Sequence, residues 1–231
     1  MFKRCVDITL SFLLLILALP FLALAACAIK LDSEGPVFFR QVRMGRDFTR
    51  FQILKLRTMR VECSGPTYTV AEDPRITRVG RWLRWLKFDE LPQLCNVLRG
   101  EMSLVGPRPM VPEVTLEFEQ AYTPLLAVRP GLTDPATLKY CREDELLSCM
   151  PDQVGYYKSV LMPDKLALSA AYLEHATVWT DFGVLARTAF ALVPHTWIPR
   201  ALRSTRAAQQ RITSERLFAE PAQPGEVEPA A

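Results

Sequence analysis

The chain opens with a long apolar segment and continues with short amphipathic segments. Residues 8–29 are almost wholly apolar and are interrupted only by Thr9, Ser11 and Pro20. About 20 such residues are enough for a helix to cross the hydrocarbon layer of a bilayer. The pattern therefore predicts a membrane-embedded helix within residues 1–30.

Basic residues flank this segment on both sides, with Lys3 and Arg4 before it and Lys30 and Arg40 after it. Loops on the cytoplasmic side of a membrane are enriched in Lys and Arg, so both flanks suit that side. Pro20 removes one backbone hydrogen bond and kinks a helix. A bent helix that enters and leaves the bilayer by the same face fits both observations, and an ordinary single-pass anchor is the alternative.

The same segment permits a third interpretation, that of an exported lipoprotein. A basic start and an apolar run are followed by Leu24-Ala25-Ala26-Cys27. This order resembles the signal of an exported lipoprotein, in which the cysteine is acylated. However, the run is longer than the roughly 7–15 apolar residues of a signal peptide, and Asp7 lies at its mouth. Mass spectrometry of Cys27 separates this interpretation from the first two.

Alternating patterns follow the apolar segment. Residues 37–42 and 48–56 are rich in β-formers, and Gly45-Arg46-Asp47 between them supplies a turn, so the pattern predicts a β-hairpin. Residues 62–72 contain Gly65-Pro66 and small polar residues, which are typical of a loop.

Tryptophans dominate the apolar face of the next segment, residues 79–87. Trp82 and Trp85 share this face with Val79, and basic side chains form its rim. Such a helix suits the headgroup layer of a membrane. A helix packed in the protein core has the same periodicity and remains the alternative.

A further helix is predicted to begin at Asp89, because Asp is a favoured N-cap, Pro92 falls in the first turn and Gly100 follows as a stop. Residues 103–109 and 128–133 are predicted as turns. The remaining predicted helices lie at residues 114–122, 143–147, 154–160, 165–175 and 181–192.

These elements predict an α+β fold that is mostly helical. It comprises an N-terminal membrane-embedded helix, a small β-hairpin and interfacial amphipathic helices around a cytoplasmic active site. The domain prediction is a membrane-embedded helix at 1–30, a catalytic domain at 31–206 and a disordered tail at 207–231, where Ala, Glu, Pro and Gln accumulate.

Composition narrows the chemistry. The 231 residues include two histidines and six cysteines without a CxxC pair, so neither a His-based zinc site nor a Ser-His-Asp triad is favoured. A net charge of +3 without an aromatic and basic RNA-binding pattern argues against nucleic acid as a partner. Carboxylates, Arg and Lys must therefore carry the chemistry.

Asp89 and Glu90 are adjacent carboxylates at the predicted start of a helix. Acidic residues there often only complement the helix dipole. A carboxylate near Mg²⁺ can also accept a phosphoryl group while its neighbour holds the metal. The cations that could bind the remaining phosphate charge are Lys55, Arg57, Arg84 and Arg108.

Several motifs together resemble the bacterial sugar transferase family, the monotopic polyprenyl-phosphate phosphoglycosyl transferases. The resemblance runs from about Lys3 to about Leu192. The motifs are Lys55-Leu56-Arg57-Thr58-Met59, Asp73-Pro74-Arg75-Ile76-Thr77-Arg78, Phe88-Asp89-Glu90-Leu91-Pro92-Gln93-Leu94, the run from Asn96 to Ser103-Leu104-Val105-Gly106-Pro107-Arg108-Pro109, and Arg129-Pro130-Gly131-Leu132-Thr133.

The resemblance implies transfer of sugar-1-phosphate from a UDP-sugar to a polyprenyl (undecaprenyl) phosphate, with release of UMP. The reaction would start assembly of a surface polysaccharide at the cytoplasmic face of the bacterial inner membrane. By the same resemblance Asp89 is the nucleophile that forms an aspartyl phosphosugar, and Glu90 is a Mg²⁺ ligand. Lys55, Arg84, Arg108, Asp181 and Arg142 match substrate-binding positions.

The chain departs from the family pattern at two places. Leu19 precedes Pro20 where the family has Ser, and Asp134-Pro135 replaces a Gly-Trp-Ala-Gln type of segment. Three alternatives stay open at this stage: a single displacement with both carboxylates as metal ligands, a non-catalytic scaffold of glycan assembly, and the exported lipoprotein. The transferred sugar, the glycan pathway and a homodimer are not decided by the residues.

Overall fold

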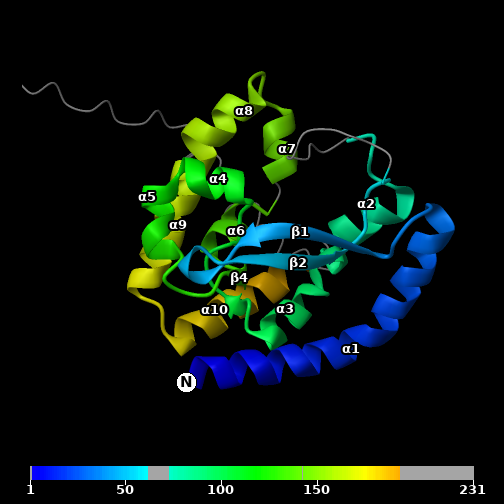
Figure 1. The fold of residues 1–231 in the computed structure, drawn as a ribbon, viewed down its shortest axis with the longest axis horizontal. Coiled ribbons are helices and arrows are strands. Elements are labelled where there is room, and N and C mark those ends of the chain that lie inside the picture. The colour runs from blue at the N-terminus through cyan, green and yellow to red at the C-terminus, as the bar shows by residue number, and fades with distance from the viewer. Residues whose placement is uncertain (1, 62–72, 142, 193–231) are drawn as a thin grey trace, which may run out of the picture. The chain divides into compact units, whose positions relative to one another are not determined.

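The structure, a computed structural model, describes residues 2–61, 73–141 and 143–192. The described residues belong to one compact unit, Met1–Leu192. They are mostly helical and contain a small antiparallel hairpin (Figure 1), which confirms that part of the predicted fold. The domain boundaries stay a prediction, and the predicted loop at 62–72 and the tail at 207–231 lie outside the described residues.

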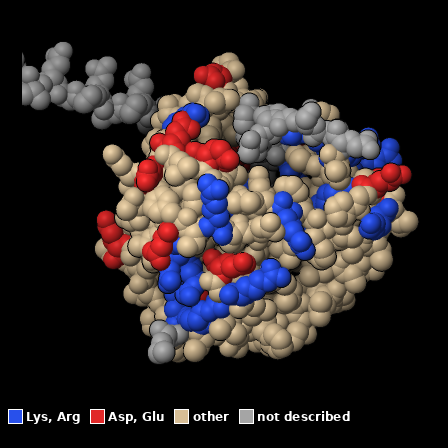
Figure 2. Space-filling model, viewed as in Figure 1, with Lys and Arg blue, Asp and Glu red and all other residues tan. Residues whose placement is uncertain are grey.

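Helix α1 (Phe2–Asp32) forms from the apolar segment and continues through Pro20. Figure 1 shows it bending around the rest of the unit. Asp7, Ser11, Ala18 and Ile29 are buried on its inner side. Most of its large apolar side chains are exposed, and the surface over α1 at the lower right of Figure 2 is almost free of charged groups. By length and composition α1 is able to cross a membrane.

The first turns of α1 are attached to the unit by polar groups. The Asp7 carboxylate accepts hydrogen bonds from Ser103 Oγ at 2.8 Å and from Leu104 N at 3.1 Å. Lys3 Nζ donates to the carbonyl of Val105 at 3.0 Å. Arg4 donates to the carbonyls of Val97 and Leu98 near the end of α3 (Gln93–Arg99). The start of α1 is therefore fixed by directional contacts as well as by apolar packing.

The hairpin consists of β1 (Phe38–Met44) and β2 (Arg50–Leu56), joined by the single turn η1 (Arg46–Phe48). This confirms the predicted hairpin. The other edge of β2 is occupied by the side chain of Asn96, whose Nδ2 donates to Gln52 O at 2.7 Å and whose Oδ1 accepts from Leu54 N at 3.0 Å. A side-chain amide thus takes the place of a third strand.

Helix α2 (Arg78–Trp85) begins at Thr77, whose hydroxyl accepts a hydrogen bond from Gly80 N. Trp82 and Trp85 are 66% and 57% exposed, so the core alternative is wrong for these two side chains. Their rings contact each other edge to face at 5.7 Å. The core contact of the helix is made by Leu83, which is buried against α1 and β2.

The predicted helix start at Asp89 is wrong. Asp89 lies in a separate 3₁₀ turn, η2 (Phe88–Glu90), and its side chain caps nothing there. Helix α3 begins at Gln93, after Pro92, and ends at Gly100, which has a φ of 88°. Asp89 belongs to this 3₁₀ turn, and two residues, Leu91 and Pro92, separate the turn from α3. The Asp89 carboxylate is therefore not used as a helix cap.

Two segments predicted as turns are short strands instead. β3 (Ser103–Val105) and β4 (Gly131–Thr133) pair in parallel. The residue after β3, Gly106, lies so close to the first residue of β4 that a Cβ at Gly131 would collide with the backbone of Gly106. Gly131 N also donates to Pro107 O at 2.9 Å. These contacts hold the chain just before Arg108 against β4.

The C-terminal half of the unit is helical. The predicted helix at 114–122 is broken at Phe118 into two helices, and the short helix after Asp134 was not predicted. Asp134 caps that helix by accepting from Thr137 N at 2.7 Å. The helices are α4 (Pro112–Glu117), α5 (Glu119–Leu125), α6 (Pro135–Lys139), α7 (Glu143–Ser148), α8 (Gln153–Tyr156), the π-helical turn η3 (Tyr157–Leu161), α9 (Met162–Glu174) and α10 (Val178–Leu192).

Candidate functional site

The adjacent carboxylates lie at a sharp change of chain direction between α2 and α3. Lys87 makes this change with a φ of 56°, a left-handed conformation that is uncommon for a residue with a side chain. The following turn, η2, directs Asp89 into the protein, where it is 7% exposed. Within the described residues, Asp89 Oδ1 is buried without a hydrogen-bond partner. An unsatisfied buried carboxylate oxygen costs free energy, so Asp89 Oδ1 is a candidate contact for a bound ligand.

Glu90 is held between two cations. Lys55 Nζ on β2 donates to Glu90 Oε1 at 2.7 Å. Arg108, beyond β3, donates from Nη1 to Glu90 Oε2 at 3.3 Å and from Nη2 to Oε1. Burial opposes ionisation of Glu90, but Arg108 and Lys55 outweigh it and hold the pKa of this carboxyl well below its usual range. Glu90 is therefore an anion that positions both cations.

The two carboxyls are driven in opposite directions. Burial raises the pKa of Asp89, and the negative charge of Glu90 adds to this effect. Lys55 is the main group that opposes it. Neighbouring carboxyls with pKa values moved apart are typical of sites where the two groups have different roles. We refer to Lys55, Asp89, Glu90 and Arg108 as the central cluster.

Arg84 and Arg57 were both predicted to bind substrate, and the structure places them differently. Arg84 is an electrostatic neighbour of Asp89, and its Nε donates to Thr58 Oγ1 at 2.9 Å. Arg57 is 4% exposed and donates to the carbonyls of Ser33 and Glu34, just after α1. The described partners of Arg57 are therefore backbone groups that shape the exit from α1.

Asp181 is not among the partners of the central cluster. Its carboxylate accepts hydrogen bonds from Lys3 and from the Tyr172 hydroxyl. These contacts join α10 to the start of α1. Arg142, the remaining predicted substrate-binding residue, lies outside the described residues. For Asp181 and Arg142, the substrate-binding role stays a prediction.

The donor set of the central cluster fits a magnesium ion in part. Mg²⁺ is usually bound by one or two carboxylates together with substrate phosphates and water. Asp89 Oδ1 has no partner, and Glu90 is next to it in the chain. No group of three or more His, Cys, Asp or Glu side chains within metal-binding reach occurs in the described part of the chain. The two carboxylates suit a magnesium ion that arrives with a phosphate ligand.

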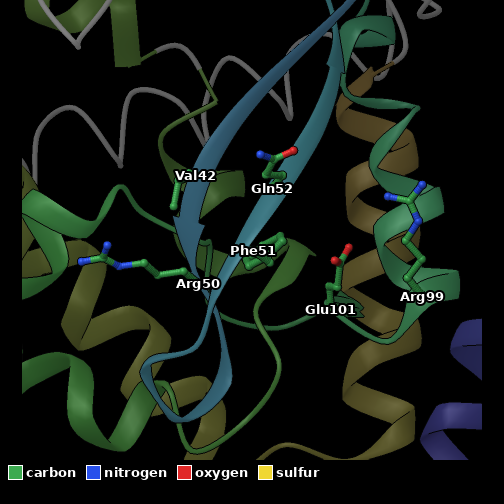
Figure 3. A pocket seen from close by; sticks show the side chains of 6 residues that line it. All are labelled: Val42, Arg50, Phe51, Gln52, Arg99 and Glu101. Carbon is green, nitrogen blue, oxygen red and sulfur yellow. The ribbon is translucent and has the colours of Figure 1, made fainter.

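A hollow of about 350 Å³ lies beside the hairpin, and no residue of the central cluster lines it (Figure 3). Val42 and Gln52 line it, and these paired residues are on the opposite face of the hairpin from Lys55. Arg99 and Glu101 close it from the end of α3. None of the predicted site residues lines this hollow.

Arg43 lies near the central cluster and was not among the predicted site residues. Its side chain donates from Nη1 to Pro109 O at 3.4 Å and from Nη2 to Gln41 Oε1 at 2.7 Å. Arg108 and Glu90 are its electrostatic neighbours. The alternation of side chains along the strands could have linked Arg43 to Lys55. With the register of the hairpin, both residues project from the same face.

Several known sugar-phosphate transferases are similar to this chain. UDP-glucose:undecaprenyl-phosphate glucose-1-phosphate transferase of Caulobacter vibrioides is 42% identical over 83% of this chain and 69% of its own length. Undecaprenyl-phosphate glucose phosphotransferase of Komagataeibacter xylinus is 40% identical over 80% of this chain and 35% of its own length. UDP-glucose:undecaprenyl-phosphate glucose-1-phosphate transferase of Escherichia coli is 37% identical over 81% of this chain and 39% of its own length.

The chain thus spans less than half the length of the last two relatives. Residues 1–195 match the description of a bacterial sugar transferase, and this range contains α1, the hairpin and the whole central cluster. With the motifs folded around one buried pair of carboxylates, the chain belongs to the bacterial sugar transferase family.

Proposed function

We propose that this protein transfers sugar-1-phosphate from a UDP-sugar to undecaprenyl phosphate and releases UMP, as the initiating membrane step of surface polysaccharide synthesis. The observation that carries the proposal is the buried, unpartnered Asp89 oxygen beside a Glu90 that holds Lys55 and Arg108. The names of three relatives, which specify glucose phosphate transfer to undecaprenyl phosphate, support the reaction.

The proposed chemistry has two displacement steps. Asp89 Oδ1 attacks the sugar-bearing phosphorus, the bond from this phosphorus to the bridging oxygen breaks, and its electron pair leaves with UMP. An oxygen of the lipid phosphate then attacks the same phosphorus and releases the Asp89 carboxylate. Lys55 and Arg108 bind the phosphate oxygens and oppose the negative charge that builds up in both steps.

Magnesium is part of the proposal. Glu90 would hold the ion beside the diphosphate, while Asp89 Oδ1 stays free to attack the phosphorus. Bound there, Mg²⁺ would neutralise phosphate charge and favour departure of the leaving phosphate. Lys55 and Arg108 already occupy part of the Glu90 carboxylate, so we expect the ion to bind more tightly with the donor than alone.

The proposed location is the cytoplasmic face of the bacterial inner membrane, with α1 re-entrant. Lys3, Arg4 and Asp7 bind the start of α1 to the same unit that its end enters. A helix held in this way at its start and continuous with the unit at its end is favoured to leave the bilayer on the side where it entered. The exposed Trp82 and Trp85 suit the headgroup layer beside it.

The test is UMP release by the purified chain in nanodiscs, with Mg²⁺, undecaprenyl phosphate and a panel of UDP-sugars. UDP-glucose is the first donor to try, followed by UDP-N-acetylgalactosamine, which other relatives name. We expect release that requires both the lipid and the metal. Silence across the panel from folded protein would refute the proposal and favour a scaffold.

The covalent intermediate needs a separate test. Donor labelled in the sugar phosphate, supplied without lipid, is expected to label the wild-type protein and not Asp89→Asn. A single displacement with both carboxylates as metal ligands predicts no label on either protein, while UMP release with lipid continues in the wild type.

A further inference from the structure

We propose that Arg43 binds the nucleoside-side phosphate of the donor, the one that leaves as UMP. The inference rests on the proposed function and extends the site to a residue that lies outside the central cluster. The geometry that carries it is a row of three cations, Lys55, Arg108 and Arg43, along one face of the hairpin.

The hairpin register creates this row. In an antiparallel pair, residues directly opposite each other project from the same face. Arg43 is opposite Phe51, and Lys55 is opposite Phe39, so both cations project from the face that carries the buried Phe51 and Ile53. They are separated by four residues along the strands, or about 13 Å. Arg108 is an electrostatic neighbour of both.

Arg43 makes no direct ion pair in the described part of the chain, although Glu90 attracts it from a longer distance. The hydrogen-bond partners of Arg43 among the described side chains and backbone groups are one carbonyl and one side-chain amide. Its Nε is buried without a hydrogen-bond partner. Burial, and then repulsion by Arg108, lower the pKa of Arg43 to about 10. A partly buried guanidinium with an unpartnered donor beside a second guanidinium is a site for an added anion.

The charges of the row suit a diphosphate. Lys55, Arg108 and Arg43 contribute three positive charges, and Glu90 alone is paired directly with two of them. A substrate with two linked phosphates matches this surplus better than a single phosphate. With the sugar-bearing phosphorus placed at Asp89, the second phosphate extends away from Asp89 along the row, towards Arg43.

A lipid phosphate and a nucleotide phosphate have the same chemistry, so charge alone does not decide which of them Arg43 binds. The position of Arg43 in the fold decides between them. Phe88, next to Asp89, packs in the cluster formed by α1 and α2, and its ring is 6.1 Å from that of Phe21. A lipid would approach from that apolar side. Met44, next to Arg43, packs instead with α5 and α9, through Tyr122 and Met162. Arg43 is therefore on the side away from α1, which suits a soluble nucleotide.

The experiment compares Arg43→Gln and Arg43→Lys with Arg40→Gln as the matched control. Arg40 is on the same strand, opposite Leu54, and projects from the other face of the hairpin. The full-length chain in nanodiscs with Mg²⁺ is titrated calorimetrically with UDP and with UMP, and the KM for undecaprenyl phosphate is measured in the turnover assay. Thermal unfolding confirms that each variant is folded.

We expect Arg43→Gln to weaken UDP and UMP binding by roughly 10- to 100-fold, which is typical for loss of a charge-assisted hydrogen bond to phosphate. Arg43→Lys retains the charge without the planar guanidinium, so its affinity should lie between those of wild type and Arg43→Gln. Arg40→Gln should bind both nucleotides like wild type. The KM for undecaprenyl phosphate should stay unchanged in all variants.

Unchanged nucleotide affinity in folded Arg43→Lys and Arg43→Gln would overturn the inference, as would a loss confined to the KM for undecaprenyl phosphate. If Arg43→Gln does not fold, Arg43→Lys decides alone. The binding measurement needs no turnover. If the wild type binds UDP but releases no UMP from any donor, the proposed function is refuted. The UDP and UMP affinities of the Arg43 variants then still decide whether Arg43 binds the nucleotide phosphate.

Discussion

The two adjacent carboxylates are expected to affect stability in opposite ways. Glu90→Gln removes the counterion that Lys55 and Arg108 share, and leaves two cations partly buried without compensation. Asp89→Asn replaces a buried carboxylate, whose Oδ1 has no partner in the described residues, by a neutral group of the same shape. The first change should destabilise the protein, and the second should leave its stability unchanged or raise it.

The magnitude follows from burial. Removing one partner of a fully buried ion pair costs roughly 3–5 kcal/mol. The side chains here are 17% exposed at Glu90, 19% at Lys55 and 34% at Arg108, which places Glu90→Gln near the lower end of that range. A loss of about 3 kcal/mol corresponds to a fall in Tm of roughly 6–12 °C for a unit of this size.

The assay is thermal unfolding of wild type, Glu90→Gln and Asp89→Asn in the same nanodiscs, without nucleotide. Asp89→Asn should also lose UMP release while its Tm stays at or above that of the wild type. Equal falls in Tm for the two variants, or no fall for Glu90→Gln, would show that Glu90 does not hold the two cations together and would refute the reasoning.

Three further predictions concern the scaffold. The pKa of Asp73 is lowered from 3.8 by hydrogen bonds from Arg75, so its stabilising effect is complete above that pH and is lost as the pH falls through the folded value. Asp73→Asn should therefore lower Tm at pH 7, and its difference from wild type should shrink steadily below pH 3.8; a constant difference would contradict this. Gly131→Ala should lower Tm by several degrees, because its Cβ collides with the backbone of Gly106, whereas Gly183→Ala, with open space at that position, should not. Asp7→Ala should destabilise the protein by about 1–3 kcal/mol in urea unfolding, because Ser103 Oγ and Leu104 N lose their buried acceptor; an unchanged midpoint would indicate that water replaces it.

Local patterns predicted the elements whose signals lie within a few residues. The hairpin was recognised because its β-formers and its turn residues are contiguous, and α2 because its apolar face repeats within one helix. β3 and β4 were missed because each has three residues next to prolines, and their pairing joins positions far apart in the chain. The sequence contains a trace of this pairing in Gly106 and Gly131, because both positions need glycine where the two backbones approach. That approach is recognised only from the structure.

The site was predictable to the extent that its chemistry is contained in motifs. Asp89 and Glu90 stood out as neighbours, and the structure brings Lys55 and Arg108 to Glu90. The start of α3 was misplaced because a 3₁₀ turn uses the same Asp and Pro signals as an α-helix N-terminus. The role of Arg43 depends on which face of β1 it occupies, and this requires the register as well as the pattern.

The contacts that attach α1 have a consequence for synthesis of the chain. Asp7 is 96 residues before Ser103, and Lys3 is 178 residues before Asp181. At roughly 5–20 residues per second, translation reaches Ser103 about 5–20 s after Asp7, and Asp181 roughly 10–35 s after Lys3. Helix α1 therefore obtains its last partner only when nearly all of the unit has been made. In the proposed re-entrant arrangement, insertion of α1 into the bilayer would come before the contacts that fix its start.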